Sequence, residues 1–379
     1  MVDWFIPGYK AGGPIQSCLN LAKALKDKFE VYVLTSDRDH GDKEPYKDIV
    51  TNTWLSDVLE GVKVFYVKQN SLNSNDLAKI INEINPEVLY LNQLFSKFFV
   101  ITPLWLKWKN KIKARVILCP RGVLHKSALS LKSYKKIPFI KLLKLIKLDK
   151  WVVFHATNEE EEKNIKLVFK NAEVIVANNL PDMDQPPVDY SKLKKPGELS
   201  CLTIARIVSI KNIFYFLEVL KNIKVNINYT IAGPIEDKKY WESCIEKIKE
   251  LPSNIKVKYI GSIEKIEVSR TIADNHLFVL PTTGENFGHA IFEALLVGRP
   301  VLISDQTPWR GLEKLKIGWD INLSKPEEFE NAINKAAQWD QEKFDDYVFG
   351  TWHFANEFIN NSTLINLYLK MFSPKKMVS

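Results

Sequence analysis

The sequence predicts an α/β protein with parallel, doubly wound sheets in two Rossmann-like domains. Short apolar runs of strand type alternate with segments of helical period along the chain, and this alternation favours βαβ units with parallel strands. A length of 379 residues suggests two domains, and a hydrophobic content of 46% is enough to fill two cores. A proline-rich stretch at 179–197 reads as the linker between a first domain at 1–178 and a second at 198–357.

In the first half, strand-like runs begin near positions 31, 62, 88, 114, 151 and 172. Segments of helical period, such as LAKIINEI and TNEEEEKNIKLVF, separate them. Residues 2–6 read as the end of an earlier strand. That strand is short, which leaves open whether the natural chain begins upstream.

A glycine pair follows this first strand. Gly12 and Gly13 precede Pro14 and an apolar pattern of helical spacing, so a flexible turn is expected to lead into a helix N-terminus. Such a turn lets the backbone approach a ligand closely, although a plain turn is the simpler interpretation.

In the second half, six runs are predicted as strands: LSCLTI, INYTIA, IKVKYIG, LFVLP, VLISD and GWDINL. Arg206 and Lys211 lie between the first of these strands and the next helix. Two cations at such a position suit a diphosphate, because arginine offers a planar fork and lysine a mobile point charge. The alternative is a pair of solvated surface side chains.

The most informative stretch is PTTGENFGHAIFEALLVGRP at 281–300. Glu285 and Glu293 stand eight positions apart, with Gly284 and Gly288 around the first and a helical apolar pattern through the second. A strand, a glycine-bearing turn and a helix N-terminus together favour an anionic or hydroxylated ligand, because free backbone amides converge there. The alternative is a solvated Glu285 and a glutamate on the helix surface.

A basic segment lies in the first domain at 139–148. Lys141, Lys144 and Lys147 recur every third residue between apolar positions, which predicts a basic amphipathic helix. Such a helix could dock on an anionic membrane surface, or pack on its own domain with solvated lysines. The net charge of +8 also favours an anionic partner.

Other features of the sequence exclude several protein classes. The four cysteines are scattered, which argues against a zinc site or a disulfide framework and fits a reducing cytoplasm. No signal peptide and no apolar stretch long enough to span a bilayer is found. No basic and aromatic motif indicates nucleic-acid binding.

The stretch GENFGHAIFEALLVGRPVLISD resembles the donor-site signature of family 4 glycosyltransferases, which are retaining enzymes of the GT-B fold. This resemblance implies two Rossmann-like domains facing a cleft, with a C-terminal helix at 358–379 that returns to the first domain. It also implies that Glu285 lies by the donor sugar and that Glu293 binds the ribose hydroxyls. Arg206 and Lys211 would bind the pyrophosphate and stabilise the leaving group, so that Glu285, Arg206 and Lys211 form the catalytic set.

The same resemblance adds further candidate residues. Asn286, Phe287 and Gly288 of the signature, with Gly12 and Gly13 of the first domain, are expected at the donor. PRGVL resembles a variant found in polysaccharide-assembling members, in which Arg121 stands where many members have histidine. Arg121 and the nearby His125 are therefore candidates for the acceptor or sugar side.

The resulting hypothesis is a retaining glycosyltransferase that uses a UDP- or GDP-sugar and a glycan or lipid-linked acceptor in cell-surface polysaccharide synthesis. No D-x-D pair follows a strand, so we expect no metal and no cofactor beyond the nucleotide sugar. We expect a cytoplasmic protein, peripheral on the inner face of the plasma membrane if 139–148 docks there. The alternatives are a noncatalytic nucleotide-binding module of a polysaccharide-assembly complex, and a phosphorylase or epimerase on the same scaffold.

Overall fold

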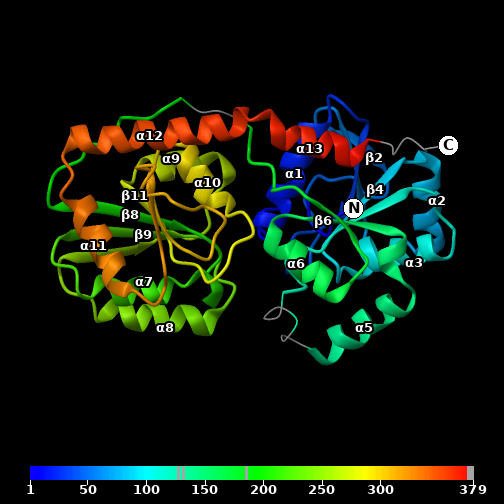
Figure 1. Cartoon of the computed structure of the whole chain (residues 1–379), viewed down its shortest axis with the longest axis horizontal. Coiled ribbons are helices and arrows are strands. Elements are labelled where there is room, and N and C mark those ends of the chain that lie inside the picture. The colour runs from blue at the N-terminus through cyan, green and yellow to red at the C-terminus, as the bar shows by residue number, and fades with distance from the viewer. Residues whose placement is uncertain (126–128, 130–132, 184–186, 374–379) are drawn as a thin grey trace. The chain divides into compact units, whose positions relative to one another are not determined.

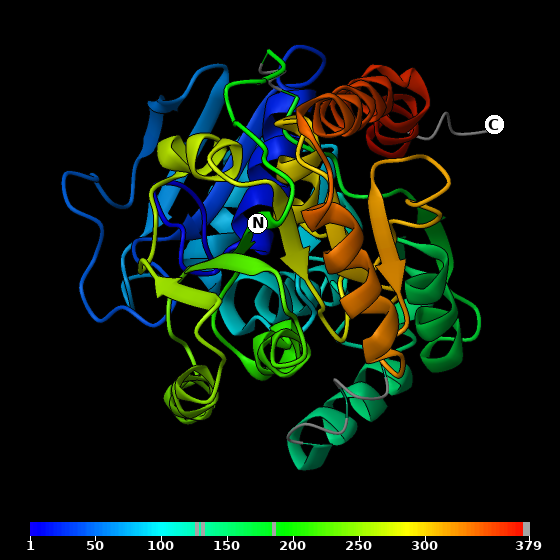
Figure 2. The ribbon, with the colours of Figure 1, turned by 90° about the vertical axis from the view of Figure 1, so that its left-hand side faces the viewer.

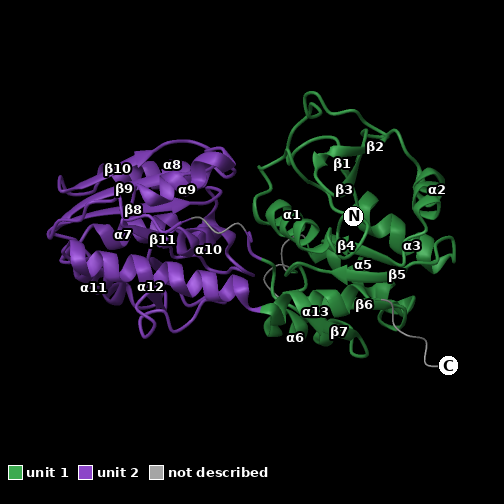
Figure 3. Ribbon diagram, turned by 90° about the horizontal axis from the view of Figure 1, so that it is seen from above, with its two compact units in different colours: residues 1–180, 362–379 green, residues 181–361 purple. Residues whose placement is uncertain are grey.

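The computed structural model describes residues 1–125, 129, 133–183 and 187–373. The chain divides into two compact units (Figure 3). Unit 1 comprises residues 1–180 and 362–379, and unit 2 comprises residues 181–361. The proline-rich stretch therefore begins at the end of unit 1, and most of it belongs to unit 2.

Unit 1 contains a three-stranded sheet in the order β1-β3-β2 and a four-stranded parallel sheet in the order β4-β5-β6-β7 (Figure 3). The strands are β1 (Val31–Ser36), β2 (Trp54–Leu59), β3 (Val62–Val67), β4 (Val88–Asn92), β5 (Arg115–Cys119), β6 (Val152–Ala156) and β7 (Glu173–Val176). The helices are α1 (Gly13–Leu25), α2 (Ser74–Ile84), α3 (Thr102–Trp108), α5 (Ser133–Leu145), α6 (Glu159–Val168) and α13 (Ser362–Phe372), with short turns η1 (Lys97–Ile101) and η2 (Leu148–Lys150).

The six strands predicted near 31, 62, 88, 114, 151 and 172 are confirmed. The sequence did not predict β2, which pairs antiparallel with β3. Its middle residues, Ser56 and Asp57, are exposed, so its apolar pattern is too weak to indicate a buried strand.

The predicted strand at 2–6 is wrong, because none of these residues is assigned to a strand. Residues 1–3 nevertheless run between β1 and β4. Their backbone bonds to Leu34 (3.1 Å) and Ser36 (3.3 Å) on one side and to Asn92 (3.2 Å) on the other. This segment therefore joins the two sheets of unit 1 without forming a regular ladder.

Unit 2 contains one six-stranded sheet in the order β10-β9-β8-β11-β12-β13, and every pair in it is parallel. The strands are β8 (Glu198–Ile204), β9 (Asn226–Ala232), β10 (Ile255–Tyr259), β11 (Leu277–Leu280), β12 (Val301–Ser304) and β13 (Gly318–Ile321). The helices are α7 (Ile213–Leu220), α8 (Lys238–Lys249), α9 (Lys265–Ala273), α10 (His289–Leu296), α11 (Pro326–Ala337) and α12 (Gln341–Asn360), with the turn η3 (Ser209–Lys211). All six predicted strands of this half are confirmed.

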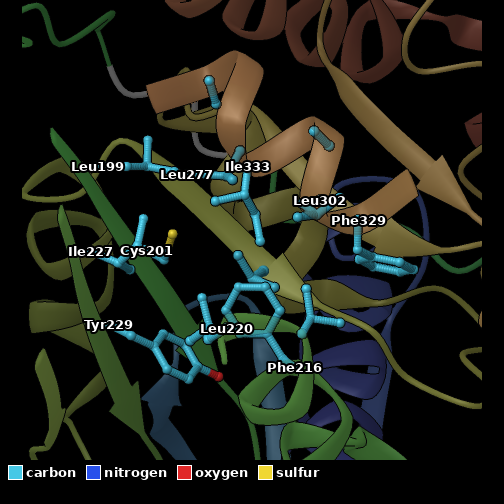
Figure 4. Packing of buried hydrophobic residues seen from close by; sticks show 14 of the residues in the cluster. Leu199, Cys201, Phe216, Leu220, Ile227, Tyr229, Leu277, Leu302, Phe329 and Ile333 are labelled. Atoms are coloured by element: carbon cyan, nitrogen blue, oxygen red, sulfur yellow. The ribbon is translucent and has the colours of Figure 1, made fainter. Parts of the chain in front are cut away.

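Helices cover both faces of the unit 2 sheet (Figures 1 and 2). Helices α7, α8 and α11 pack on one face, and α9 and α10 pack on the other. Because both faces are covered, every residue of β11 and β12 is buried, which explains their unbroken apolar sequence. On the first face, Phe216 of α7 packs against Tyr229 of β9 with ring centroids 5.0 Å apart (Figure 4).

The C-terminal helix expected at 358–379 is not one continuous helix, because its described residues, up to 373, divide between two helices. Helix α12 ends at Asn360, Asn361 adopts an extended conformation, and α13 begins at Ser362. The division between units falls at this break, so α12 belongs to unit 2 and α13 to unit 1.

The basic helix predicted at 139–148 also differs in its bounds. Helix α5 runs over Ser133–Leu145, and Lys147 lies beyond it in a left-handed conformation. Its buried residues are Ile140 and Leu143. Among the described helices, none is both long enough and apolar enough to cross a membrane.

Candidate functional site

In unit 2, the residues singled out by sequence lie where strands end. Arg206 and Lys211 follow β8, and the loop 281–288 follows β11, its neighbour in the sheet. Ligands of parallel α/β sheets bind at the carboxyl ends of strands. The structure therefore gathers most of the sequence candidates of this half at one sheet edge.

The structure joins Lys211 and Glu285 in an ion pair between Nζ and Oε1. Their side chains are only 16% and 13% exposed, so water screens the attraction weakly. The two loops are also tied through the backbone, because Ile210 O accepts hydrogen bonds from Thr283 N and from Thr282 Oγ1, both at 2.9 Å. The position of each charged group thus depends on the other loop.

Arg206 forms a second pair, with Nη1 2.6 Å from Glu236 Oε2 in the loop after β9. Gly233 allows this loop to approach the one after β8. Its φ is +134°, and a Cβ at this position would lie 1.9 Å from Ala205 O. Only glycine fits such a close approach, so Gly233 fixes the spacing of the loops that carry Arg206 and Glu236.

Glu293 lies on α10 and pairs with Lys265 Nζ at the start of α9. Asp182 Oδ2 is 3.6 Å from the same ammonium group. Burial opposes the charge on Lys265, but the two carboxylates outweigh it and raise the pKa of this lysine above its ordinary value. Both glutamates of the signature are therefore held by a lysine.

The remaining signature residues lie around the start of α10. Gly288 has a φ of +77° and precedes the first helical residue. Asn286 is half-buried. Phe287, predicted at the donor, is only 3% exposed and packs against Trp309, whose Nε1 donates a hydrogen bond to Phe287 O. Its side chain anchors the loop in the core and is not available to a ligand.

Gly12, Gly13, Arg121 and His125 belong to unit 1. Gly12 has a φ of +64° and precedes α1, and a Cβ there would meet no atom within 4 Å. The sequence expectation of a glycine turn leading into a helix with an early proline is confirmed.

Arg121 follows β5 and has a left-handed backbone, with a φ of +60°. Its guanidinium donates to Asn92 Oδ1 (2.8 Å from Nη2) and to Asn179 Oδ1. These two acceptors are side-chain amides, one on the last residue of β4 and the other after β7. His125 is exposed, and its Nε2 lies 3.5 Å from Glu160 Oε1 on α6.

His155 of β6 is fully buried near Arg121. Its Nδ1 accepts from Tyr90 Oη at 2.6 Å and its Nε2 donates to Ala177 O at 2.8 Å. Burial, assisted by the positive charge of Arg121, lowers the pKa of His155 to about 3. The native state therefore keeps this imidazole neutral where an unfolded chain would protonate it.

This shift predicts a pH dependence of the stability of unit 1. The unfolded histidine titrates near pH 6.5, so the contribution to stability is complete above that pH and is lost as the pH falls towards 3, by roughly 1.4 kcal/mol per pH unit. Calorimetric unfolding of the full chain between pH 8 and 4.5 measures it. The His155→Gln variant should show a shallower slope, and identical slopes would contradict the assignment.

Three partners in these pairs were missed by sequence analysis: Glu236, Lys265 and Asp182. Each is a single charged residue in a loop or at a helix start, without a motif around it. All four cysteines are free and buried. Among the described residues, no group of three or more His, Cys, Asp or Glu side chains has the arrangement to hold a metal ion.

Residues 184–346 match the family model described as glycosyl transferases group 1. No curated protein matches the chain in sequence.

Several solved structures share the fold. One is Anabaena HepE in complex with UDP and glucose (TM-score 0.68, 14% identity, covering 98% of this chain and 99% of that chain). A second is WaaG, a glycosyltransferase involved in lipopolysaccharide biosynthesis (0.63, 12%, 98% and 97%). A third is a variant of S. aureus TarM solved with UDP (0.59, 14%, 79% and 59%), so the chain spans about three fifths of the TarM chain.

Proposed function

We propose that this chain is a retaining glycosyltransferase, because residues 184–346 match the glycosyl transferases group 1 model and the fold is shared with solved glycosyltransferases such as WaaG. It transfers a sugar from a UDP- or GDP-sugar to a glycan or lipid-linked acceptor in the synthesis of a cell-surface polysaccharide such as lipopolysaccharide. The observation that carries this proposal is the Lys211–Glu285 pair at the carboxyl edge of the unit 2 sheet, where Arg206 follows the same strand as Lys211.

The proposed roles follow from the charge that develops during transfer. The bond between the anomeric carbon and the phosphate oxygen breaks, and the nucleoside diphosphate leaves with the bonding electrons. Arg206 and Lys211 stabilise that negative charge. The acceptor hydroxyl oxygen bonds to the anomeric carbon with retained configuration, and its proton passes to the departing diphosphate. Glu285 orients the sugar hydroxyls.

Binding of the donor diphosphate would replace ion pairs within the protein by contacts between the same cations and the diphosphate. Lys211 and Arg206 are paired with Glu285 and Glu236, so a diphosphate competes with carboxylates for both cations. Glu293, already held by Lys265, accepts the ribose hydroxyls. We propose that two protein cations suffice for the diphosphate and that transfer needs neither a metal nor a further cofactor.

A thermal-shift screen of UDP-, GDP- and ADP-sugars on the full chain tests the donor site. One nucleotide class should raise the melting temperature through binding to the native state, and EDTA should leave both the shift and turnover unchanged. Arg206→Ala and Glu293→Ala should each reduce the shift. Glu236→Gln removes only the competing carboxylate and should preserve it. A folded protein that no nucleotide sugar stabilises or reacts with would favour the noncatalytic module.

We further propose that α5 docks unit 1 on an anionic membrane, where a lipid-linked acceptor would be presented. Leu142 and Leu145 are 52% and 78% exposed, and Lys141 and Lys144 are exposed beside them. Apolar and basic side chains on one exposed helix suit the boundary between headgroups and acyl chains. The protein would then act as a cytoplasmic enzyme, peripheral on the inner face of the plasma membrane.

Charge reversal at Lys141 and Lys144 tests this docking. Each lysine near an anionic surface contributes about 1 kcal/mol, so the double glutamate variant should bind phosphatidylglycerol-containing vesicles at least tenfold more weakly in a sedimentation assay. The matched control reverses Lys239 and Lys249, which are exposed on α8 of unit 2, and should bind normally. Equal binding by both double variants would refute the proposal.

A further inference from the structure

The segment formed by residues 1–3 marks the place in unit 1 where the order of the strands reverses. It lies between β1 and β4, to which it is hydrogen-bonded on its two sides. In Figure 3 the N-terminus accordingly stands between β1, β3 and β2 on one side and β4 to β7 on the other. In open parallel sheets, the crevice at the carboxyl ends of strands at such a reversal is the preferred position of a ligand.

A cavity of about 360 Å³ lies at this position. Residues that end or follow β1, β3 and β4 line it together with residues that follow the 1–3 segment. Its volume is at the lower end of the range for small-molecule sites, roughly 300–1,000 Å³. The lining residues that matter for the argument are Asp3, Trp4, Arg38, Lys68, Asn70 and Phe98.

Most carboxylates at the cavity already have structural partners. Asp37 bonds to Arg38 Nε at 2.8 Å, and Asp42 bonds to Lys10 Nζ at 2.5 Å. Asp39 accepts backbone amides, including that of Tyr9 at 2.7 Å. These groups shape the loop after β1 and have little capacity left for a ligand.

Asp3 is different from these three aspartates. Its Oδ1 accepts a hydrogen bond from Ser96 Oγ at 2.7 Å, and the positive charges of the N-terminus and of His40 act on the same carboxyl group. Burial raises the pKa of Asp3 above its ordinary value, although Ser96 acts in the opposite direction. A carboxyl group in this position retains an oxygen that can accept a hydroxyl group of a ligand.

The charge of the cavity disfavours anionic ligands. The lining holds four aspartates, Asp3, Asp37, Asp39 and Asp42, and only two cations, Arg38 and Lys68. The guanidinium of Arg38 is already engaged by Asp37 and by Lys43 O. A phosphate or uronate would therefore meet like charge, which costs free energy.

Aromatic side chains form part of the wall of the cavity. Trp4 is half-buried, and its ring is held edge-on against His40 with centroids 4.6 Å apart. Phe98 contributes another aromatic wall. An aromatic surface with a carboxylate and an amide nearby complements a sugar ring, whose C–H faces are apolar and whose rim carries hydroxyl groups.

We propose that this cavity binds an uncharged saccharide unit of the acceptor, with the sugar ring against Trp4 and a hydroxyl group donating to Asp3. The inference rests on the proposed function, because it specifies the acceptor of the same transfer reaction. Phosphorylated and uronic acid units are discriminated against at this position.

Saturation-transfer NMR on the full chain tests the cavity directly. The probes are the methyl glycosides of glucose, galactose, mannose and N-acetylglucosamine, together with glucose 6-phosphate and glucuronic acid. At least one uncharged glycoside should bind, and the two anionic sugars should bind at least tenfold more weakly than the best of them. Absence of binding by every glycoside, or stronger binding of an anionic sugar, would overturn the proposal.

Variants locate the binding. Trp4→Ala and Asp3→Asn should each weaken the glycoside affinity about tenfold, and Trp4→Phe, which keeps an aromatic ring, should weaken it less. The matched control is Trp105→Ala, an exposed tryptophan on α3 of the same unit, and should leave the affinity unchanged. Unchanged affinity in Trp4→Ala and Asp3→Asn would place the site elsewhere. The thermal shift with the nucleotide sugar is measured on the same samples, so that loss of acceptor binding alone is distinguished from failure of the donor site.

Discussion

Replacing Lys211 by alanine is expected to lower the rate of sugar transfer by about 10²–10³-fold. In the proposed mechanism its ammonium group stabilises charge on the departing diphosphate, and removal of one such preorganised group typically has an effect of this size. The same change leaves Glu285, which is largely buried, without its cation. The nucleotide sugar should therefore also bind more weakly, because an uncompensated carboxylate remains beside the diphosphate.

Steady-state kinetics with the nucleotide sugar identified by the thermal-shift screen provide the measurement. Lys221→Ala is the matched control, since Lys221 is a lysine of the same unit that pairs with exposed Glu250 at 2.7 Å. It should retain full activity. Circular dichroism must show that Lys211→Ala is folded. A folded Lys211→Ala protein with a rate within a factor of three of the wild type would remove this lysine from the mechanism.

The second large effect is expected on stability, at Gly233. An alanine Cβ would lie 1.9 Å from Ala205 O and 2.7 Å from Ala205 C, and the φ of +134° disfavours any L-residue. Neither atom belongs to a flexible side chain, so the backbone after β8 or β9 would have to shift. We expect Gly233→Ala to destabilise unit 2 by more than about 3 kcal/mol, within the range seen for strained backbone and overpacked sites.

Chemical denaturation followed by circular dichroism measures this loss. Gly284→Ala is the control from the same sheet edge, because a Cβ at Gly284 would meet no atom within 4 Å. It should unfold within about 0.5 kcal/mol of the wild type. If both glycine variants have the same stability as the wild type, the close approach of the two loops does not constrain unit 2.

Strand positions could be predicted from sequence wherever the apolar signal was strong. In unit 2, β11 and β12 are buried throughout and have unbroken apolar runs, whereas β9 and β10 alternate apolar and polar residues, and both patterns identified strands. Strand β2 and the 1–3 segment were not described correctly for the opposite reason. Strand β2 is half exposed, and the 1–3 segment bonds irregularly to β1 and β4 through its backbone. Neither segment therefore has a periodic pattern of apolar residues.

At the candidate site, the sequence identified individual residues but not the contacts between them. Lys211 and Glu285 were both singled out, but their pairing joins residues 74 positions apart and depends on the order of strands in the sheet. Phe287 illustrates the limit of motif reasoning. It lies within the signature, yet Trp309 packs on it from a later loop and draws its side chain into the core.

The sequence predicted a basic helix at 139–148, but the distribution of buried and exposed residues along α5 differs from the prediction. Period-three lysines indicated a helix with separate basic and apolar faces. In the structure Ile140 and Leu143 are buried and Phe139 packs against Phe95, whereas the other apolar residues, Tyr134, Ile137, Leu142 and Leu145, are exposed. The number of contacts that a helix makes with its own domain is a tertiary property, and local periodicity does not contain it.

The position of α13 bears on how the protein is made. Tyr368 and Met371 of this helix pack in one cluster with Leu21 of α1 and Val153 of β6, and Tyr368 Oη donates to Asn178 O at 2.9 Å. During synthesis, the ribosome therefore releases the first 180 residues, and then all of unit 2, before the helix that completes the first core emerges. Apolar surface on α1 and β6 stays uncovered throughout that interval. Nascent chains that carry residues 1–361 are thus the form most exposed to aggregation and to chaperone binding, and unit 2 can complete its fold before unit 1.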